Sequence, residues 1–448
     1  MGLMSLAGYI RKHSDYHIRI IDALLEDLTP EGLRAIMEEE KPDVVGIHAI
    51  TLALLDVLDT SRIVRMSNPG VKIVMGGPHT SIFPEESLGY SEFDYVVLGE
   101  GEKPFFDLLK YLETGDKSLL PIDGVMGGEE ELNRLASPYI HDDLDTLPPP
   151  ARDLTQYDRY STVVSRHPPT TTIMGSRGCP YKCTFCYTAG GKRFRPRSVD
   201  NIIKEIQECI ELGIREFFFF DETFFIDKDR VIEFCRRIID EDLHFYWDVR
   251  GRVDLVNPEM LRWMKKAGCQ RIQYGVESGN ARVLKILKKG FTPDMAGKAI
   301  GWTREAGIST YADFMIGNPG ETMEEIMETI EFARKISPDY VHYSITTPYP
   351  KTELYRQALE RGIIEKDYWS EFAKNPTEDF RIRYWEENFS AEQLEKLIDK
   401  AYRSFYLRPG YLLKSLKKLG SLGELKRKAK AGLSLLKIRH AKEDDGRE

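Results

Sequence analysis

The sequence has few cysteines and no long apolar run. Only six of its 448 residues are cysteine, and none precedes Cys179. No stretch of 18 or more apolar residues occurs, which argues against a transmembrane helix, and the N-terminus lacks a signal-peptide pattern. A net charge of −9 argues against general nucleic-acid binding. These absences indicate a cytoplasmic protein with free thiols.

The composition is otherwise that of a globular protein, with 42% hydrophobic residues and enough length for two or three domains. Short apolar runs alternate with helical patterns over residues 17–135. Strands are expected at 17–21, 44–48, 71–75 and 95–98, and helices at 2–12, 30–40, 54–66 and 102–112. This alternation predicts a doubly wound, Rossmann-like parallel sheet with helices on both faces.

Glycines follow two of these expected strands, as Gly76-Gly77 and as Gly99 and Gly101. Ligands of doubly wound sheets bind outside the carboxyl ends of the strands, where the backbone must approach them closely. A simple Gly-Pro turn is the alternative for the first pair. A stiff run, Pro148–Pro150, then lies in a linker expected over residues 136–165.

A second alternation of strand and helix covers residues 168–350. Six strands are expected, at 171–174, 216–220, 244–249, 271–274, 310–316 and 340–346. Six such units predict a partial (βα)6 TIM-like barrel. Polar residues and glycines cluster just after each strand, on the face where barrel active sites form.

Three cysteines follow the first barrel strand in the pattern C-x-x-x-C-x-aromatic-C, as Cys179, Cys183 and Cys186. Three thiolates so close together leave one iron of a four-iron cluster without a protein ligand. Structural zinc is the weaker alternative, because it needs four ligands and no fourth Cys or His lies nearby. The other three cysteines are expected to be small buried hydrophobic residues: Cys209, Cys235 and Cys269.

This cysteine pattern and its downstream context resemble the signature of the radical SAM enzymes. The resemblance implies that the open iron chelates the amino and carboxylate groups of S-adenosylmethionine (SAM). Electron transfer from the cluster then yields a 5′-deoxyadenosyl radical. The resemblance also implies that Phe185 packs near the adenine.

The remaining SAM positions lie at strand ends. Asp221 and Glu222 match the acidic motif for the SAM amino group, and helix capping is the alternative. Arg250 and Arg252 are candidate donors to a carboxylate or to the substrate, and surface ion pairing is their alternative. The resemblance adds four further positions: Glu277, Ser278, Gly317 and Pro319.

The N-terminal glycine motifs resemble the cobalamin-binding domain that precedes many radical SAM cores, over nearly all of residues 1–110. In that family three strand-end loops surround the cofactor. They correspond here to Thr51, Leu52, Gly76, Gly77, Pro78, His79, Gly99, Glu100, Gly101 and Glu102.

Two departures from this family pattern are present. The family's first strand and Pro-rich loop precede the helix at residues 2–12, so either the start assigned at Met1 is too late or the domain lacks that strand. No D-x-H-x-x-G motif supplies a lower axial histidine, and His48 and His79 lie nearest the expected site. We therefore expect no protein histidine on the cobalt.

The C-terminal residues read as helices at 353–361 and 391–407. Residues 403–442 then hold twelve Lys or Arg against a single acid, Glu424, with leucines interleaved. A basic amphipathic helix is typical of peripheral contact with a membrane surface. A solvated tail or a helix packed on the barrel are the alternatives.

These patterns predict four regions: residues 1–135 (cobalamin-binding), 136–165 (linker), 166–352 (radical SAM barrel) and 353–448 (C-terminal helices). The expected cofactors are a [4Fe–4S] cluster, SAM and cobalamin, with a flavodoxin- or ferredoxin-like electron donor. The expected reaction is C-methylation of an unactivated carbon in a small, lipid or isoprenoid, substrate.

Other reactions stay open. Oxidative cyclisation or ring rearrangement would use the same domain pair, and a cobalamin- or SAM-responsive binding protein would not turn over. Methylthio transfer to RNA is disfavoured, because that family carries extra cluster cysteines in its N-terminal domain and residues 1–178 contain none.

Overall fold

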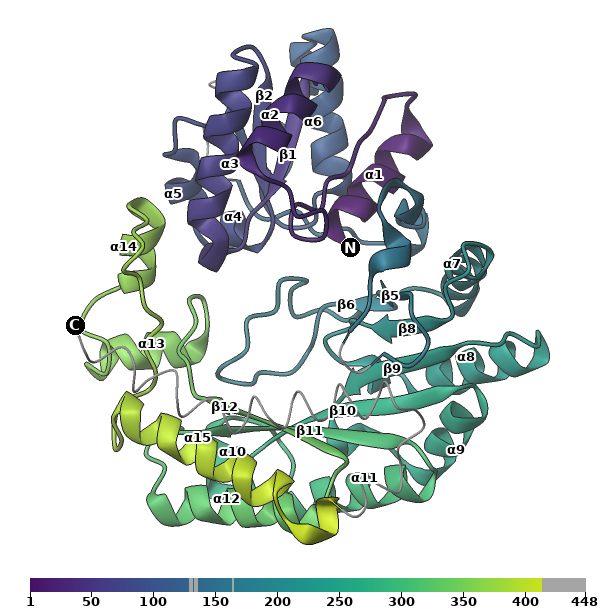
Figure 1. Ribbon diagram of the computed structural model, residues 1–448, viewed down its shortest axis with the longest axis vertical. Coiled ribbons are helices and arrows are strands. Elements are labelled where there is room, and N and C mark those ends of the chain that lie inside the picture. Colours follow the sequence, from purple (N-terminus) through teal and green to yellow (C-terminus); the bar gives the residue numbers. More distant parts are fainter. Residues whose placement is uncertain (129–131, 133–135, 163–164, 413–448) are drawn as a thin grey trace.

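A computed structural model describes residues 1–128, 132, 136–162 and 165–412. Figure 1 shows an N-terminal α/β domain above a larger half-barrel, with the C-terminal helices along one side. Within the described residues, no helix is long and apolar enough to cross a membrane. The basic C-terminal segment predicted to contact membranes lies outside the described residues from residue 413 onward.

The N-terminal domain has a four-stranded sheet in the order β1-β2-β3-β4. Its strands are β1 (Val44–His48), β2 (Lys72–Gly76), β3 (Tyr95–Val97) and β4 (Val125–Gly127). The first three run parallel, which confirms the main prediction. At the edge β4 pairs antiparallel to β3, as happens in many doubly wound sheets.

Helices cover both faces of this sheet. Alternate residues of β2 point to opposite faces. Ile73 and Met75 pack with α2 (Pro30–Glu40) and α3 (Leu54–Ser67). Val74 packs on the other face with α6 (Glu102–Thr114). The doubly wound layering is therefore confirmed.

The strand predicted at His17–Ile21 was wrong. The segment alternates in exposure as a strand would, but its backbone joins no ladder in the described structure. Before it, α1 (Gly2–His13) packs beside α6 and the proline linker. A Cβ on Gly8 would lie 2.4 Å from the carbonyl oxygen of Pro149, so only glycine allows this close approach.

The barrel sheet has six parallel strands in the order β12-β11-β10-β9-β8-β5, which confirms the six predicted units. The strands are β5 (Thr170–Ile173), β8 (Glu216–Phe219), β9 (Tyr246–Gly251), β10 (Cys269–Glu277), β11 (Ser309–Ile316) and β12 (Tyr340–Ile345). The helices between them are α7 (Val199–Glu211), α8 (Lys228–Asp240), α9 (Pro258–Lys266), α10 (Ala281–Ile286), α11 (Pro293–Glu305) and α12 (Met323–Ile336).

The outer face of this sheet carries the large core. Trp247 of β9 is fully buried against Phe219 and Phe234, and Tyr274 of β10 hydrogen-bonds Thr303 of α11. Because side chains alternate along a strand, the neighbouring residues face the inside of the half-barrel.

The C-terminal helices close the edges of the molecule. They are α13 (Glu353–Glu360), α14 (Tyr368–Lys374) and α15 (Ala391–Tyr406). Two tyrosine hydroxyls of α15, on Tyr402 and Tyr406, exchange hydrogen bonds with the backbone of edge strand β12. This pairing satisfies groups that an open edge would expose.

The helix α14 bridges the barrel side to the N-terminal domain. The Ser370 hydroxyl donates to Glu86 of α5 (Pro84–Leu88) over 2.8 Å, and Phe372 joins the core of the N-terminal sheet.

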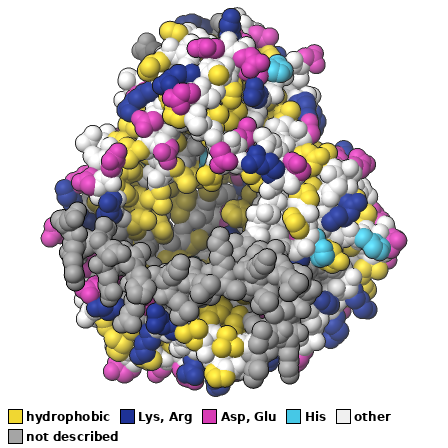
Figure 2. All heavy atoms as spheres, viewed as in Figure 1, with side chains coloured by type: hydrophobic (Ala, Val, Ile, Leu, Met, Phe, Trp, Pro, Cys, Tyr) yellow, Lys and Arg dark blue, Asp and Glu magenta, His cyan; other side chains and the backbone are white. Residues whose placement is uncertain are grey.

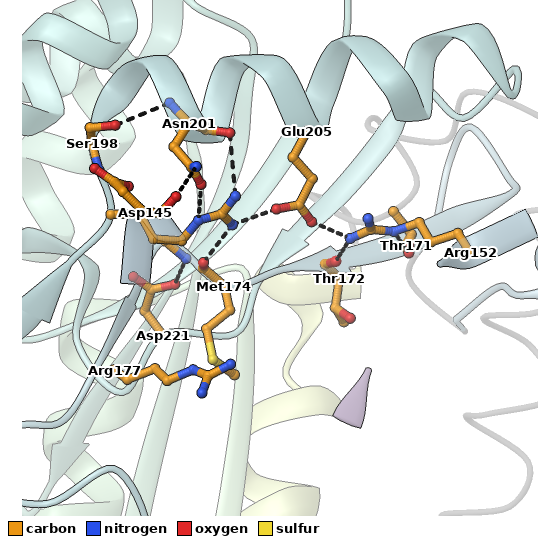
Figure 3. A network of polar contacts seen from close by, with 12 residues as sticks. Asp145, Arg152, Thr171, Thr172, Met174, Arg177, Ser198, Asn201, Glu205 and Asp221 are labelled. Atoms are coloured by element: carbon orange, nitrogen blue, oxygen red, sulfur yellow. Dashed lines mark hydrogen bonds and ion pairs between the residues drawn. The ribbon is translucent and has the colours of Figure 1, made fainter. Parts of the chain in front are cut away.

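The linker is joined to the barrel by a buried Arg–Glu–Arg arrangement (Figure 3). Glu205 of α7 lies between Arg152 of the linker and Arg197, pairing with Arg152 over 2.5 Å and also with Arg197. Arg152 further donates to the backbone of Thr172, and Arg197 to the backbone of Met174. The two guanidinium groups thus fix the linker and the end of β5 to one helix.

Replacing Glu205 with Ala should leave two buried guanidinium groups without a countercharge. We expect a loss of about 3–5 kcal/mol in the free energy of unfolding, measured by urea denaturation. The exposed Glu211 on the same helix is the matched control, and Glu211→Ala should change stability by less than about 0.5 kcal/mol. Equal stability of the two variants would contradict this account.

Candidate active site

A small hairpin carries the three predicted cluster cysteines. Its strands are β6 (Ser176–Arg177) and β7 (Arg195–Pro196), and the loop between them holds Cys179, Cys183 and Cys186. Gly178 opens the loop with φ of +83°, and a Cβ there would lie 2.2 Å from the carbonyl oxygen of Arg193. Only glycine fits this position.

The three thiols lie within electrostatic reach of one another. Burial, and then the charges of Cys183 and Cys179, raise the pKa of Cys186. Arg252 Nη1 lies 3.8 Å from the Cys183 sulfur, and Thr223 Oγ1 lies 3.9 Å from that of Cys179. Within the described chain, no three His, Cys, Asp or Glu side chains already form a ligand set for one metal ion.

This donor set fits a [4Fe–4S] cluster. Thiolates are the usual ligands of iron–sulfur clusters, and bound metal removes the mutual repulsion that opposes their ionisation. The remaining cysteines are buried in the core, as predicted: Cys209, Cys235 and Cys269.

The acidic pair after β8 divides into an inner and an outer residue. Asp221 is 1% exposed and accepts hydrogen bonds from the Gly175 backbone over 2.8 Å and from the Ser176 hydroxyl over 2.5 Å. Glu222 is exposed. Asp221 therefore holds the entry to the cysteine loop, whereas Glu222 is the member of the pair available to a ligand.

Glu277, predicted to contact SAM, ends β10 in a left-handed conformation with φ of +67°. Its carboxylate is buried and lies 3.1 Å from the Lys289 ammonium. That ammonium also lies 5.6 Å from the ring centre of Phe185 in the cysteine loop. The structure thus brings two predicted SAM positions together through a lysine.

The other predicted SAM positions lie at the ends of β10 and β11. Ser278 is fully buried and hydrogen-bonds the Thr329 hydroxyl over 2.9 Å, so its side chain supports the helix layer. Gly317 has φ of +75° at the end of β11, and Pro319 follows in a buried turn. The backbone N–H groups of Asn318 and Gly320 in this turn already donate to Glu321 and Glu387.

The predicted cobalamin loops meet at the carboxyl ends of β1, β2 and β3. Gly77 has φ of +107°, and a Cβ there would lie 2.7 Å from the carbonyl oxygen of Ala49. Pro78 and His79 begin the short helix α4 (Pro78–Ile82). Gly76 ends β2, and Leu52 is 55% exposed beside it in the loop after β1.

His79 is fully buried, and its Nδ1 lies 3.1 Å from the Thr51 hydroxyl. Burial lowers the pKa of His79 to about 4, so the ring is neutral at physiological pH. Its Nε2 has no hydrogen-bond partner among the described residues.

The third cobalamin loop, Gly99–Glu102, makes a contact that sequence patterns did not indicate. Gly99 (φ +81°) and Gly101 lead into α6. Glu100 and Glu102 are buried, and their carboxylates pair with arginines of the cysteine hairpin. Arg177 lies 3.1 Å from Glu100 and 2.5 Å from Glu102.

Arg195 completes this interdomain ion-pair cluster, at 2.5 Å from Glu100. Burial opposes ionisation of Glu100, but the hydrogen bond from Arg195 and the charge of Arg177 hold its pKa below the usual value. The four side chains fasten the two ends of the cysteine loop to the N-terminal domain.

Two protein-family models match the chain. The B12 binding domain family matches residues 1–109, and the Radical SAM superfamily matches residues 173–333. An uncharacterized methyltransferase of Pyrococcus horikoshii is 36% identical, over 93% of this chain and 89% of that protein. The chain belongs to the cobalamin-binding radical SAM enzymes.

Two further relatives widen the comparison. The hopanoid C-3 methylase of Methylococcus capsulatus is 30% identical to this radical SAM enzyme, over 82% of the chain and 70% of the relative. The radical SAM methyltransferase TsrM of Kitasatospora setae, solved with cobalamin and a [4Fe-4S] cluster, superposes with a TM-score of 0.68 at 18% identity. That alignment covers 80% of this chain and 74% of TsrM, and it shows the shared fold.

The family membership confirms the expected cofactors, which are a [4Fe–4S] cluster, SAM and cobalamin. Sequence reasoning missed three residues of this radical SAM enzyme's site. Arg177 and Arg195 flank the cysteine loop, and the spacing Arg-Gly-Cys was the available signal for the first. Lys289 lies twelve residues after its partner Glu277 and gave no signal.

Replacing Glu100 and Glu102 together with Gln should leave Arg177 and Arg195 facing each other without compensation. We expect the cysteine loop to open and the reconstituted protein to lose most of its iron and sulfide, with a stability cost of about 3–5 kcal/mol. Glu113→Gln, an exposed site on the same helix, is the control. A double variant with wild-type iron content would contradict the role of the cluster.

Burial raises the pKa of Asp221 to about 6. The folded chain then binds more protons than the unfolded chain between about pH 4 and 6, so this carboxyl reduces stability as pH rises through that window. Asp221→Asn should therefore gain stability relative to wild type from pH 4 to pH 6, by up to about 3 kcal/mol. Thermal unfolding against pH measures this, with exposed Asp229→Asn as control. If the difference in stability between Asp221→Asn and wild type did not change with pH, the raised pKa of Asp221 would be contradicted.

Proposed function

We propose that this enzyme transfers a methyl group to an unactivated carbon of a substrate with a large apolar part. The observation that carries the proposal is the ion-pair cluster of Glu100, Glu102, Arg177 and Arg195. It fixes the cobalamin-side loop and the cysteine loop against each other. A substrate between them would meet both cofactors without a movement of the domains.

The molecule is hollowed between its two main parts. Figure 2 shows a central hollow between the N-terminal domain and the barrel, with hydrophobic side chains gathered along its rim. Large apolar side chains are also exposed at strand ends in both domains, including Leu52 after β1, Phe220 after β8 and Tyr349 after β12. Apolar walls exclude water, which would otherwise quench a radical.

When bound, the cluster, SAM and cobalamin supply the electron, the radical and the methyl group. The chain's residues bind and orient. Cys179, Cys183 and Cys186 hold the cluster, and Glu222 is available to the SAM ammonium. The Glu277–Lys289 pair lies beside Phe185, where it can set the position of the adenosine. At Gly77 and Gly99 the loop backbone passes very close to other backbone atoms, which leaves no room for a side chain. These two loops can therefore form part of the wall of a cobalamin site.

A lipid or isoprenoid is the substrate class we propose. The apolar hollow and the similarity to a hopanoid C-3 methylase support it. A flavodoxin- or ferredoxin-like protein is the proposed electron donor. Peripheral membrane contact through the basic residues after 412 would place the enzyme near such substrates, and liposome flotation with and without residues 411–448 tests that contact.

The proposed reaction is tested with SAM carrying a deuterated methyl group. The reconstituted enzyme, supplied with dithionite and a lipid extract, should form both 5′-deoxyadenosine and a product three mass units heavier than the one made from unlabelled SAM. Deoxyadenosine with an unlabelled product would indicate cyclisation or rearrangement instead. Absence of deoxyadenosine would indicate a binding protein without turnover.

Replacing any one cluster cysteine with Ala should abolish 5′-deoxyadenosine formation, because the remaining two thiols cannot retain a reducible cluster. Cys209→Ala, a core cysteine outside the loop, is the matched control and should keep its iron. Chromatographic measurement of deoxyadenosine together with iron counts checks both variants. Retained deoxyadenosine formation in Cys183→Ala would overturn the assignment.

A further inference from the structure

The inner face of the half-barrel carries a diagonal row of mostly polar side chains. The row runs across five adjacent strands and consists of Phe218, Arg250, Gln273, Asp313 and His342. Their chain neighbours, such as Val249 and Tyr274, are buried toward the helices, so alternation turns this row inward. Barrel interiors are usually filled by branched apolar residues, and this layer differs.

Hydrogen bonds connect the row and fix its members. The Arg250 Nε donates to the Gln273 amide oxygen over 3.3 Å. The Gln273 amide nitrogen donates to both oxygens of Asp313, over 2.9 and 3.1 Å. His342 Nδ1 lies 3.6 Å from Asp313. Gln273 separates the arginine from the aspartate, so the carboxylate does not neutralise the guanidinium through direct contact.

The end of Arg250 is left without a partner. Its guanidinium lies 5.1 and 4.9 Å from the ring centres of Phe218 and Phe220. Among the described residues, no hydrogen bond or ion pair reaches its two terminal nitrogens. By contrast, the neighbouring inner-face arginines are paired, Arg271 with Asp248 and Arg252 with Asp254.

An unpaired, half-buried guanidinium is unfavourable. Burial lowers the pKa of Arg250, although Asp313 acts in the opposite direction. The free edge of the group presents parallel N–H donors, a geometry that matches the two oxygens of a carboxylate or a phosphate. The two phenylalanine rings beside it suit the carbon atoms next to such a group.

The guanidinium of Arg250 lies deeper in the barrel than the cysteine loop. Arg252 lies beside Cys183, and Arg250 precedes it by two residues on the same face. Two residues along a strand span about 6.6 Å, so Arg250 lies one layer deeper in the barrel. Of the two roles that the sequence left open for Arg250, this depth favours a contact with the substrate over one with the carboxylate of SAM.

We propose that Arg250 binds an anionic oxygen group of the substrate, a carboxylate or a phosphate, with Gln273 and Asp313 orienting the guanidinium. The inference rests on the proposed function and narrows its substrate to an amphiphile. The apolar body lies toward the hollow between the domains, and the anionic end lies at Arg250 on the inner face of the barrel.

The test uses the full-length enzyme, reconstituted with its cluster and saturated with SAM. Equilibrium dialysis compares four probes: farnesyl diphosphate, palmitate, neutral farnesol and inorganic phosphate. We expect farnesyl diphosphate or palmitate to bind at least tenfold more tightly than farnesol. Tighter binding of farnesyl diphosphate would indicate that the substrate ends in a phosphate, and tighter binding of palmitate would indicate a carboxylate. Binding of inorganic phosphate alone, or no preference over farnesol, would overturn the proposal.

Variants localise the effect. Arg250→Met should remove the preference for the anionic probe, and Arg250→Lys should keep part of it. Arg236→Met is the matched control, because Arg236 also lies over an aromatic ring, Trp263, but on the outer surface. Unchanged farnesol binding in Arg250→Met shows that the pocket is still folded. An anion preference that survives in Arg250→Met would overturn the proposal.

Two readouts separate this proposal from its alternatives. The Kd for SAM should change less than twofold in Arg250→Met, and a tenfold weakening of SAM would return Arg250 to the SAM site and overturn the inference. The labelled-methyl experiment is independent. Arg250-dependent anion binding without methyl transfer would support the subsite and reject the proposed reaction.

Discussion

The buried pairing of Glu100 and Glu102 with Arg177 and Arg195 is the interaction on which the site depends. The two arginines face each other across the two-residue ladder of the cysteine hairpin. Like charges directly opposite in a ladder repel. Here the Arg195 side chain is buried and that of Arg177 is mostly buried. Carboxylates from the other domain neutralise this repulsion. The cluster-binding loop is therefore not a property of the barrel alone, although all its cysteines lie there.

This dependence links the cofactors thermodynamically. The carboxylates belong to the loop after β3, whose glycines shape one wall of the expected cobalamin site. A ligand that orders this loop should also order the cysteine hairpin. By thermodynamic linkage, a ligand bound at the hairpin should then change the binding free energy at the loop by the same amount. The contact of α14 with α5 supports the N-terminal domain from the opposite side. Two bridges thus hold the domains around the hollow, so closure does not need to be driven by substrate binding.

Much of the architecture could be predicted because its signals are local. Helix Pro30–Glu40 and strand Val44–His48 match their predicted bounds, since capping residues and apolar runs mark them. The strand predicted at residues 17–21 does not form, because a strand also needs a neighbouring strand to pair with. The alternation of apolar and polar residues does not show whether such a neighbour exists. The ion-pair cluster joins residues 75 to 95 positions apart, and no periodicity signals such a contact. Motif resemblance located Glu100 and Glu102 at the right site but could not show where their side chains point.

The buried ion pairs of this molecule lie at two particular places, and there is a physical reason for this. Buried ion pairs contribute little net stability, because desolvation offsets most of their attraction, but breaking one partner is costly. Such pairs therefore specify geometry, and they occur where geometry matters: at the linker through Glu205 and at the cysteine loop through Glu100. On the inner face of the barrel, Arg250 does not follow this rule. The guanidinium of Arg250 is half-buried and has no countercharge in direct contact among the described residues. A ligand that supplies the missing oxygens would bind favourably to these free N–H groups.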